Sequence, residues 1–253
     1  MKILVSNDDG FHALGINTLF DTLEQTYSVT MVAPNQERSS CGHGITLGEP
    51  IRIIQHHEKV FACSGYPADC VLIGLGHLFS DQKPDVIVSG INHGANLGQD
   101  RFYSGTMAAA REAAFRGIPS IAVSLVTKSG DNDEHFEPVA NFVKKCLDAG
   151  IVEYIPAMCM ININAPNIPE ENISGIKLTK VGFQRYSEKV VERVDTRGRN
   201  YYWVGGTYEG HENIPGSDCN AVSDGFISVN LQSLTDVDQT EAQINLENFL
   251  RSL

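Results

Sequence analysis

Short aliphatic runs alternate with helical hydrophobic patterns over the first two thirds of this sequence, and this alternation limits the possible folds more than any other feature. The predicted strands are Lys2–Ser6, Ser28–Ala33, Val60–Cys63, Asp85–Ser89, Pro119–Leu125 and Pro156–Ile163. The predicted helices are Leu14–Thr26, Ala68–Phe79, Gly105–Arg116 and Glu134–Ala149. Strands that alternate with helices form a parallel sheet covered by helices on both faces. The sequence therefore predicts an α/β fold with a mostly parallel sheet.

After Pro166 the pattern changes. Lys180–Glu192 and Tyr201–Thr207 are rich in Val, Tyr, Phe and Trp, and turn-forming residues separate them, which predicts a long hairpin. Because a two-stranded hairpin is only marginally stable alone, we expect this one to pack on another subunit. A strand at Gly225–Asn230 and a terminal helix at about Asp236–Ser252 complete the predicted elements.

The formal charge of the 253-residue chain is −12, from 19 Lys and Arg against 31 Asp and Glu. Binding along a nucleic-acid backbone requires a basic face, so we expect no DNA or RNA polymer as a partner. A small anionic substrate stays compatible with this charge because one bound metal ion reverses the local field of an acidic site.

The six cysteines include no C-x-x-C pair, which favours free thiols in a reducing compartment over a disulfide scaffold. The N-terminus meets Asp8 and Asp9 before the apolar core of a signal peptide could form. No apolar run approaches the ~20 residues that span a bilayer. We therefore expect a cytoplasmic protein without a membrane segment.

Polar clusters follow three of the predicted strands, at Asn7–Gly10, Asn35–Gly44 and Gly90–Thr106. In a parallel sheet, ligands bind outside the carboxyl ends of the strands, near the point where the strand order switches. We therefore expect these three loops to meet in one crevice.

Asp8 and Asp9 directly follow the first predicted strand and precede Gly10. A turn can bring both carboxylates close to one ion, and such oxygen ligands suit Mg²⁺, Mn²⁺ or Ca²⁺ rather than zinc. The alternative is structural: Asp9 and Gly10 form a simple turn, and Asp8 caps the next helix.

Asn92 and Asn96 lie in the glycine-rich segment Gly90–Gly98, where an amide oxygen can join a metal already held by two carboxylates. Ser104 then precedes a predicted helix as its N-cap, and the free N–H groups of that helix end suit a phosphate. The alternatives are an ordinary turn and an ordinary cap.

In the cluster Asn35–Gly44, a hydroxyl at Ser39 or Ser40 can complete a metal shell or bind phosphate, and Arg38 can neutralise a phosphate oxygen. The alternative is a solvated surface loop. Cys41 and His43 also admit a thiol–imidazole pair, which a two-residue spacing within one loop supports only weakly. Gly74-Leu-Gly-His lacks the third glycine of a dinucleotide-binding loop, and the other histidines are scattered.

Several short motifs occur in a fixed order along most of the chain. They are Ile3–Gly10 (Ile-Leu-Val-Ser-Asn-Asp-Asp-Gly), Val32–Pro34 with Arg38-Ser39, Gly65–Cys70 (Gly-x-Pro-x-Asp-Cys), Ser89–Gly98 (Ser-Gly-Ile-Asn-x-Gly-x-Asn-x-Gly), Tyr103–Thr106, Gly216–Asp218 and Ala221-Val222. In order and spacing they closely resemble the survival protein SurE family of 5′-nucleotidases.

The resemblance implies a three-layer, Rossmann-like catalytic domain over residues 1–165. It implies a hairpin and helix extension over residues 166–253 that packs back on the core and builds homodimers or homotetramers. It also implies one divalent metal ion, Mg²⁺ or Mn²⁺, per subunit. Carried over residue by residue, the metal ligands fall on Asp8, Asp9, Ser39 and Asn92. The phosphate-binding positions fall on Asn96, Ser104, Gly105 and Thr106.

Two departures from the family pattern leave the conformation of the second loop and the substrate preference open. Ser40 and Cys41 follow Arg38-Ser39 where the family usually has glycine, and Tyr66 stands where a small hydroxyl residue is frequent.

The implied activity is hydrolysis of nucleoside 5′-monophosphates, with Asp8 and Asp9 as the catalytic pair. Further candidate substrates are 3′-nucleotides and short polyphosphates. Water or an aspartate can attack phosphorus, and we favour water because a metal-bound carboxylate is a weak nucleophile. One alternative is a nucleotide-sensing protein without turnover. Another, a receiver-like signalling module, is disfavoured because Asp85 begins its strand instead of ending it.

Overall fold

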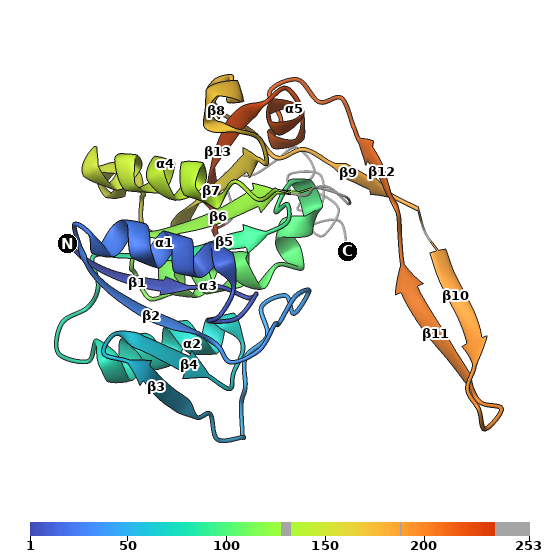
Figure 1. Cartoon of the computed structure of the whole chain (residues 1–253), viewed down its shortest axis with the longest axis horizontal. Coiled ribbons are helices and arrows are strands. Elements are labelled where there is room, and N and C mark those ends of the chain that lie inside the picture. Colours follow the sequence, from blue (N-terminus) through green and yellow to red (C-terminus); the bar gives the residue numbers. More distant parts are fainter. Residues whose placement is uncertain (128–132, 188, 236–253) are drawn as a thin grey trace, which may run out of the picture.

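A nine-stranded sheet forms the centre of the computed structural model, which describes residues 1–127, 133–187 and 189–235 (Figure 1). In spatial order its strands are β3 (Ile53–His57), β4 (Val60–Cys63), β2 (Ser28–Pro34), β1 (Lys2–Ser6), β5 (Val86–His93), β6 (Ser120–Val126), β7 (Cys159–Pro166), β13 (Phe226–Ser233) and β8 (Gly175–Leu178). The six strands from β4 to β7 run parallel, whereas β3 pairs antiparallel with β4 and β13 pairs antiparallel with β7. The edge strand β8 pairs parallel with β13. The expected mostly parallel sheet is confirmed.

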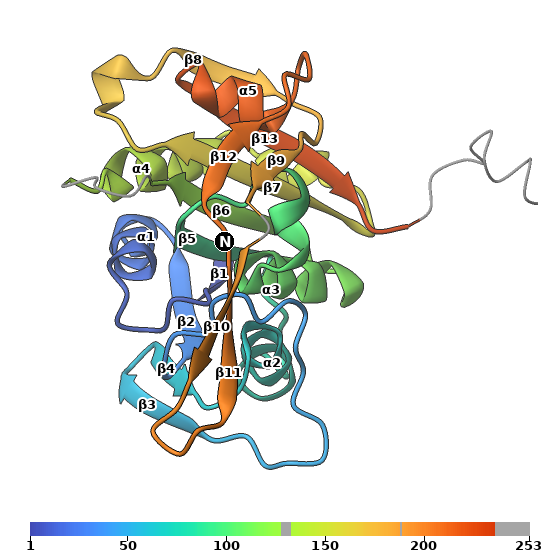
Figure 2. The same ribbon diagram turned by 90° about the vertical axis from the view of Figure 1, so that its right-hand side faces the viewer.

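Helices cover both faces of the sheet (Figure 2). On one face lie α1 (Leu14–Glu24) and α4 (Phe136–Asp148), and on the other lie α2 (Pro67–Ile73) and α3 (Gly105–Phe115). Shorter helical segments are η1 (Gly74–Leu78), η2 (Gly98–Phe102), η3 (Ile151–Tyr154), η4 (Glu170–Asn172) and α5 (Asp218–Ser223). The architecture is the expected three-layer, Rossmann-like arrangement.

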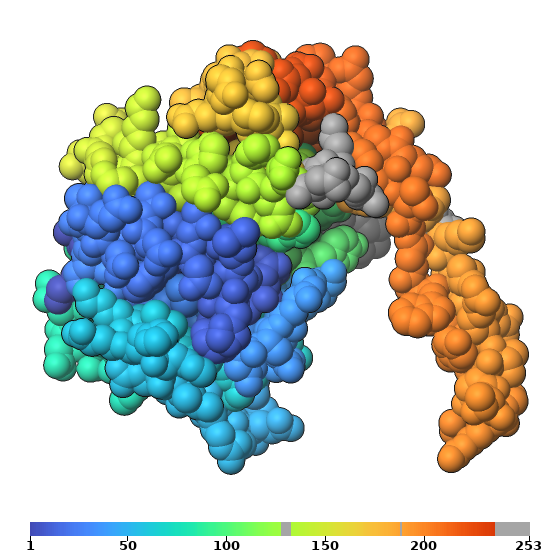
Figure 3. Space-filling model, viewed as in Figure 1, coloured from blue at the N-terminus to red at the C-terminus, as the bar shows by residue number. Residues whose placement is uncertain are grey.

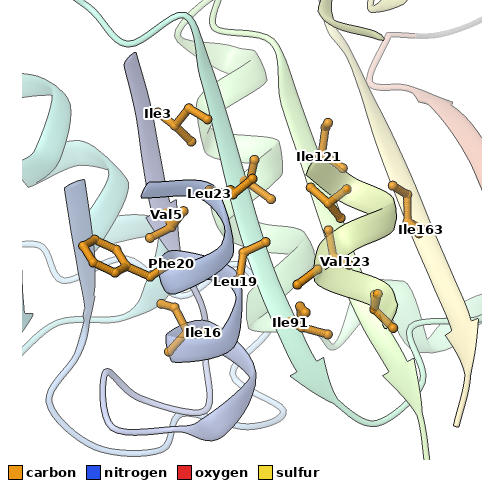
Figure 4. Packing of buried hydrophobic residues seen from close by; sticks show 14 of the residues in the cluster. Ile3, Val5, Ile16, Leu19, Phe20, Leu23, Ile91, Ile121, Val123 and Ile163 are labelled. Carbon is orange, nitrogen blue, oxygen red and sulfur yellow. The ribbon is translucent and has the colours of Figure 1, made fainter. Parts of the chain in front are cut away.

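The α1 helix shows how the hydrophobic spacing builds the core. Ile16, Leu19, Phe20 and Leu23 recur at helical spacing, so they share one face of the helix, and Figure 4 shows them over the sheet. All four are buried, in one cluster with strand residues such as Val5. Burial of each such side chain stabilises the fold by roughly 1.5–3 kcal/mol.

The first turn of α1 lies directly against β5. A Cβ atom on Gly15 would lie 2.0 Å from the carbonyl oxygen of Ile91 and 2.9 Å from the Phe136 ring. Only a residue without a side chain permits this approach. Gly15 therefore sets the position of α1 against the carboxyl end of β5.

The strand order switches beside β1. The chain leaves β1 for β2 and β4 on one side, then returns to β5 on the other side. The register pairs Ser6 with Ser89, so the two strands carry their following loops to the same edge. A crevice at this switch point is the expected ligand site of such a sheet.

The structure corrects the predicted end of β5. The sequence predicts that the strand ends at Ser89 and that a loop begins at Gly90, but the strand continues to His93. A register shift between Ser89 and Asn92 keeps the later residues paired with β6, and Ile91 is fully buried. The edge strands β3 and β8 and the short α5 are also absent from the sequence prediction.

The predicted hairpin is confirmed as two successive antiparallel pairs. We call it the arm: β9 (Gln184–Tyr186) pairs with β12 (Tyr208–His211), and β10 (Lys189–Val194) pairs with β11 (Asn200–Gly205). It begins at Gln184, later than the predicted Lys180. Figures 1 and 3 show the arm standing away from the body, with open space between it and the sheet.

Two further predictions concern the region after residue 165. The strand at Gly225–Asn230 is confirmed as part of β13, which joins the main sheet together with β8. The predicted terminal helix at Asp236–Ser252 lies outside the described residues. Among the described helices, none combines the length and apolar character needed to cross a bilayer.

Candidate active site

The turn after β1 presents Asp8 and Asp9 at the switch point. Asn7 donates from its Nδ2 to the carbonyl oxygen of Gly10 (2.9 Å), and Gly10 has a φ of 96°, a conformation that favours glycine. Asp8 is almost fully buried, with 4% of its surface exposed. The sequence Asn-Asp-Asp-Gly therefore folds into a turn that holds one carboxylate inside the crevice.

The N-terminus of α3 binds the Asp8 carboxylate. The backbone N–H of Gly105 donates to Asp8 Oδ2 (3.0 Å), and the hydroxyl of Thr106 donates to Asp8 Oδ1. Ser104 caps the helix, because its Oγ accepts from the backbone N–H of Met107 (3.1 Å). The predicted N-cap is confirmed, and the donors predicted for a phosphate hold another anion, a carboxylate.

Asp9 is held by a different element. Its Oδ2 accepts from the backbone N–H of His93 at the end of β5 (3.1 Å). Burial and the neighbouring Asp8 charge raise the pKa of Asp9 to about 6. Burial also raises the pKa of Asp8, although its hydrogen bonds with Thr106 and Gly105 oppose the shift. Neither carboxylate forms an ion pair within the described residues.

The second loop reaches the same site through its backbone. The N–H of Arg38 donates to the carbonyl oxygen of Asp8 (2.7 Å). The exposed Ser39 hydroxyl donates to Glu37 Oε1 (2.7 Å). Ser39 thus follows a residue that contacts Asp8, and its own hydroxyl is bound to Glu37.

Cys41 and His43 do not form the thiol–imidazole pair that the sequence left open. His43 Nε2 lies 3.0 Å from Glu112 Oε2, and its Nδ1 faces Arg111. Burial and the Asp8 charge raise the pKa of Cys41 to about 11, so its thiol stays protonated at neutral pH. A protonated thiol is a poor nucleophile.

The two predicted asparagines have different surroundings. Asn92 Nδ2 donates to the carbonyl oxygen of Gly94 (2.9 Å), and its Oδ1 has no hydrogen-bond partner within the described part of the chain. The side chain of Asn96 is turned inward, because its Nδ2 donates to Ser124 Oγ (2.7 Å) and its backbone N–H donates to Asn164 Oδ1 (2.8 Å).

Sequence analysis missed the residues that hold Asn96. Asn162 and Asn164 donate from their side-chain amides to its carbonyl oxygen, at 2.9 and 3.2 Å. Both are buried on β7, where they alternate with isoleucines. Alternation of amides with apolar residues inside a predicted buried strand is the signal that would have identified them.

The donor set suits a hard divalent cation. Asn7 Oδ1 is buried beside Asp8 and has no hydrogen-bond partner among the described residues. No group of three or more His, Cys, Asp or Glu side chains within the described ranges is arranged to hold a metal ion. A metal here would therefore rely on the two carboxylates together with neutral amide or hydroxyl oxygens, the ligands of Mg²⁺ and related ions.

This chain is similar to proteins of one known family. The family model for survival protein SurE matches residues 3–188. The 5′-nucleotidase SurE of Myxococcus xanthus is 44% identical over 221 residues, which cover 87% of this chain and 82% of that protein. The 5′-nucleotidase SurE of Vibrio campbellii is 40% identical over 229 residues, covering 90% and 87%.

A solved structure extends the agreement to the fold. The crystal structure of the SurE protein from Aquifex aeolicus superposes with a TM-score of 0.85 at 35% identity, and the match covers 99% of this chain and 100% of that chain. The shared motifs, the shared fold and the match to the family model lead to one conclusion: this chain belongs to the survival protein SurE family.

Proposed function

We propose that this chain is a divalent-metal-dependent 5′-nucleotidase, which hydrolyses nucleoside 5′-monophosphates to nucleoside and phosphate. The observation that carries the proposal is the Asp8–Asp9 pair, two carboxylates without an ion-pair partner among the described residues, at the N-terminus of α3. The names of the relatives, 5′-nucleotidase SurE, support the same reaction class.

In this proposal, Asp8, Asp9, Ser39 and Asn92 hold one Mg²⁺ or Mn²⁺ ion. The buried, partly uncompensated charge of the two carboxylates and the free Oδ1 of Asn92 support this ligand set. When bound, the ion supplies positive charge that polarises a phosphoryl oxygen and lowers the pKa of a nearby water.

The phosphate would lie at the N-terminus of α3, among Asn96, Ser104, Gly105 and Thr106. The Gly105 N–H and the Thr106 hydroxyl donate to a carboxylate in this structure, so they are directed at an anion. Such donors stabilise the charge that develops on phosphoryl oxygens. Water remains our preferred attacking group, because a carboxylate that binds the metal is a weak nucleophile.

The test is phosphate release from AMP and GMP with Mg²⁺ or Mn²⁺. We expect release that EDTA abolishes and that Asp8→Asn reduces by about 100-fold or more. Asp85→Asn is the matched control, because Asp85 is an exposed acid that accepts from Lys2 N at the opposite edge of the sheet. Folded, metal-loaded wild type that releases no phosphate from any nucleoside monophosphate would refute the proposal.

The proposal also covers further substrates, the cellular compartment and the assembly. We extend the substrates to 3′-nucleotides and short polyphosphates, and we place the protein in the cytoplasm, which its six free cysteines support. We also propose a homodimer or homotetramer in which residues 166–253 act as an assembly extension of the catalytic domain, residues 1–165. The exposed aromatic residues of the arm support this assembly.

A further inference from the structure

A cavity of about 340 Å³ opens in the surface between Tyr66, which precedes α2, and the segment 45–51. Ligand pockets in proteins have volumes of roughly 300–1,000 Å³, so the cavity suits one small ring system. Arg38, Ser64 and Tyr66 form one wall, and residues of the segment 45–51 form the other. Figures 1 and 3 show the chain between β2 and β3 projecting from the body on the side that faces the arm.

Arg38 connects the lining of the cavity to the candidate active site. The backbone N–H of this residue donates to the carbonyl oxygen of Asp8 (2.7 Å), whereas its side chain lines the cavity. The proposed metal ligand Ser39 is its neighbour in the chain. If the phosphate of a substrate lies at α3 and the carboxylate pair, the opposite end of that substrate can therefore reach this cavity.

The first wall presents flat groups. The guanidinium carbon of Arg38 lies 5.1 Å from the centre of the Tyr66 ring, and Arg38 Nη2 donates to the carbonyl oxygen of Ser64 (3.0 Å). Guanidinium planes and aromatic rings are the surfaces on which proteins stack nucleobases.

The second wall is exposed and mixed, with apolar side chains beside the polar residues Thr46 and Glu49. Leu47 has 85% of its surface accessible, and Ile45 is also exposed, beside Pro50 and Ile51. A flat heterocycle that covers so exposed an apolar side chain removes apolar surface from water, which stabilises the complex. A ring placed between the two walls would lose water from both of its faces.

The two walls are joined before any ligand binds. Asp69, which is 1% exposed, accepts from the backbone N–H and the hydroxyl of Thr46 at 3.0 and 2.7 Å. The same carboxylate accepts from the backbone N–H of Tyr66 at 2.8 Å. Asp69 thus holds both walls, and a preformed cavity lowers the ordering cost of binding.

We propose that this cavity is the subsite for the nucleobase of the substrate, with Tyr66 and Leu47 as specificity-determining residues. The inference rests on the proposed nucleotidase activity. It explains how a nucleotide is distinguished from a phosphorylated sugar: the phosphate and ribose are common to both, and only the base reaches the cavity.

The test compares kinetics with AMP and with ribose 5-phosphate, which lacks the base. Leu47→Ala and Tyr66→Leu are expected to raise the KM for AMP by about tenfold, since stacking on one base is worth about this factor or more. The KM for ribose 5-phosphate and the kcat for both compounds stay within about twofold, because the cavity contributes binding and not chemistry.

Two matched variants serve as controls. Leu178→Ala removes a leucine that is 82% exposed on β8, at the other edge of the sheet, and both KM values should remain those of wild type. Tyr66→Phe keeps the ring and should keep the KM for AMP. If Tyr66→Leu does not fold, Leu47→Ala still decides, because so exposed a side chain contributes little to stability.

A second measurement separates this inference from the proposed hydrolysis. Equilibrium dialysis with adenosine, which has no phosphate, should show binding that Leu47→Ala weakens about tenfold. Adenosine binding of this kind without phosphate release would refute the nucleotidase and keep the subsite. The proposed subsite is refuted if wild type hydrolyses AMP while the variants leave the KM for AMP unchanged. It is also refuted if the variants raise the KM for AMP and for ribose 5-phosphate by the same factor.

Discussion

Asp8 and Asp9 are neighbours in the chain, but different elements hold them. The N-terminus of α3 binds the Asp8 carboxylate, and the backbone of β5 at His93 binds the Asp9 carboxylate. The turn at Gly10 therefore places two negative charges where a helix end and a strand end meet. Burial of both charges costs free energy unless protons or a cation offset it.

The Asp9 shift predicts a pH dependence for the metal-free protein. A carboxyl with a pKa of about 6 in the folded state, above its usual value of about 3.9 when unfolded, binds protons more tightly in the folded state. Its contribution to stability is thus fully present below pH ~4 and is lost as the pH rises through about 6.

Thermal unfolding in EDTA checks this shift by comparing wild type with Asp9→Asn, which cannot ionise. The melting temperature of the variant should exceed that of wild type by a margin that grows from about pH 4 to pH 7. Adding Mg²⁺ at pH 7 should raise the melting temperature of wild type and not that of the variant. Parallel pH curves for the two metal-free proteins would contradict the assignment.

At the level of elements, the site depends on how closely α1, α3 and β5 approach one another. Gly15 lets α1 lie on the carbonyl oxygen of Ile91, and Gly105 lets α3 lie on Asp8, where an added Cβ would be 2.7 Å from the Asp8 Cβ. The glycines near the N-termini of α1 and α3 thus allow β5 and the first turn of α3 to lie close around the carboxylate pair.

Gly15→Ala tests the contact between α1 and β5. The added Cβ would lie 2.0 Å from a backbone oxygen, so the elements must separate, and we expect a loss of about 1–3 kcal/mol in the free energy of unfolding. Activity should also fall, because β5 carries Asn92 and His93. Chemical denaturation measures the stability.

Gly76→Ala is the matched control for this substitution. Gly76 lies in η1, and an added Cβ there would meet no atom within 4 Å, so stability should be unchanged or slightly higher. Equal losses in the two variants would show that the contact with Ile91 is not the cause.

At the scale of the whole molecule, the arm is the feature that an isolated chain does not account for. Its outer strands, β10 and β11, are exposed along almost their whole length and carry apolar and aromatic side chains, among them Tyr202, Trp203 and Val204. Two exposed strands bury too little surface to be stable by themselves. A second copy of the chain is the covering partner that we propose.

Replacing residues 189–205 with a short turn should lower the oligomeric state in solution. Light scattering coupled to size-exclusion chromatography gives the mass directly. Trp203→Ser is expected to shift the same equilibrium more weakly. Tyr154→Ser changes an aromatic of η3 on the body that is at least as exposed, and it should leave the equilibrium unchanged. A full-length protein that is monomeric at high concentration would contradict the proposed assembly.

Much of the fold follows from local sequence patterns. Aliphatic runs and helical spacing give the order of strands and main helices from β1 to β7, except β3, because burial on one face imposes its period on the residues of each element. The same patterns place three polar loops after strands, and the geometry of parallel sheets brings those loops to one edge. The carboxylate pair and the Ser104 cap could be predicted from the sequence for the same reason.

Tertiary structure alone decided the rest. The edge strand β3 is mostly exposed, so no apolar pattern marks it, and β4 supplies its partner. β5 continues past Ser89 because β6 pairs with its later residues. Asn96 faces Ser124 and the Asp8 carboxylate occupies the N-terminus of α3. Each of these outcomes depends on groups far away in the chain, and a local pattern records which face of an element is buried but not which group it meets there.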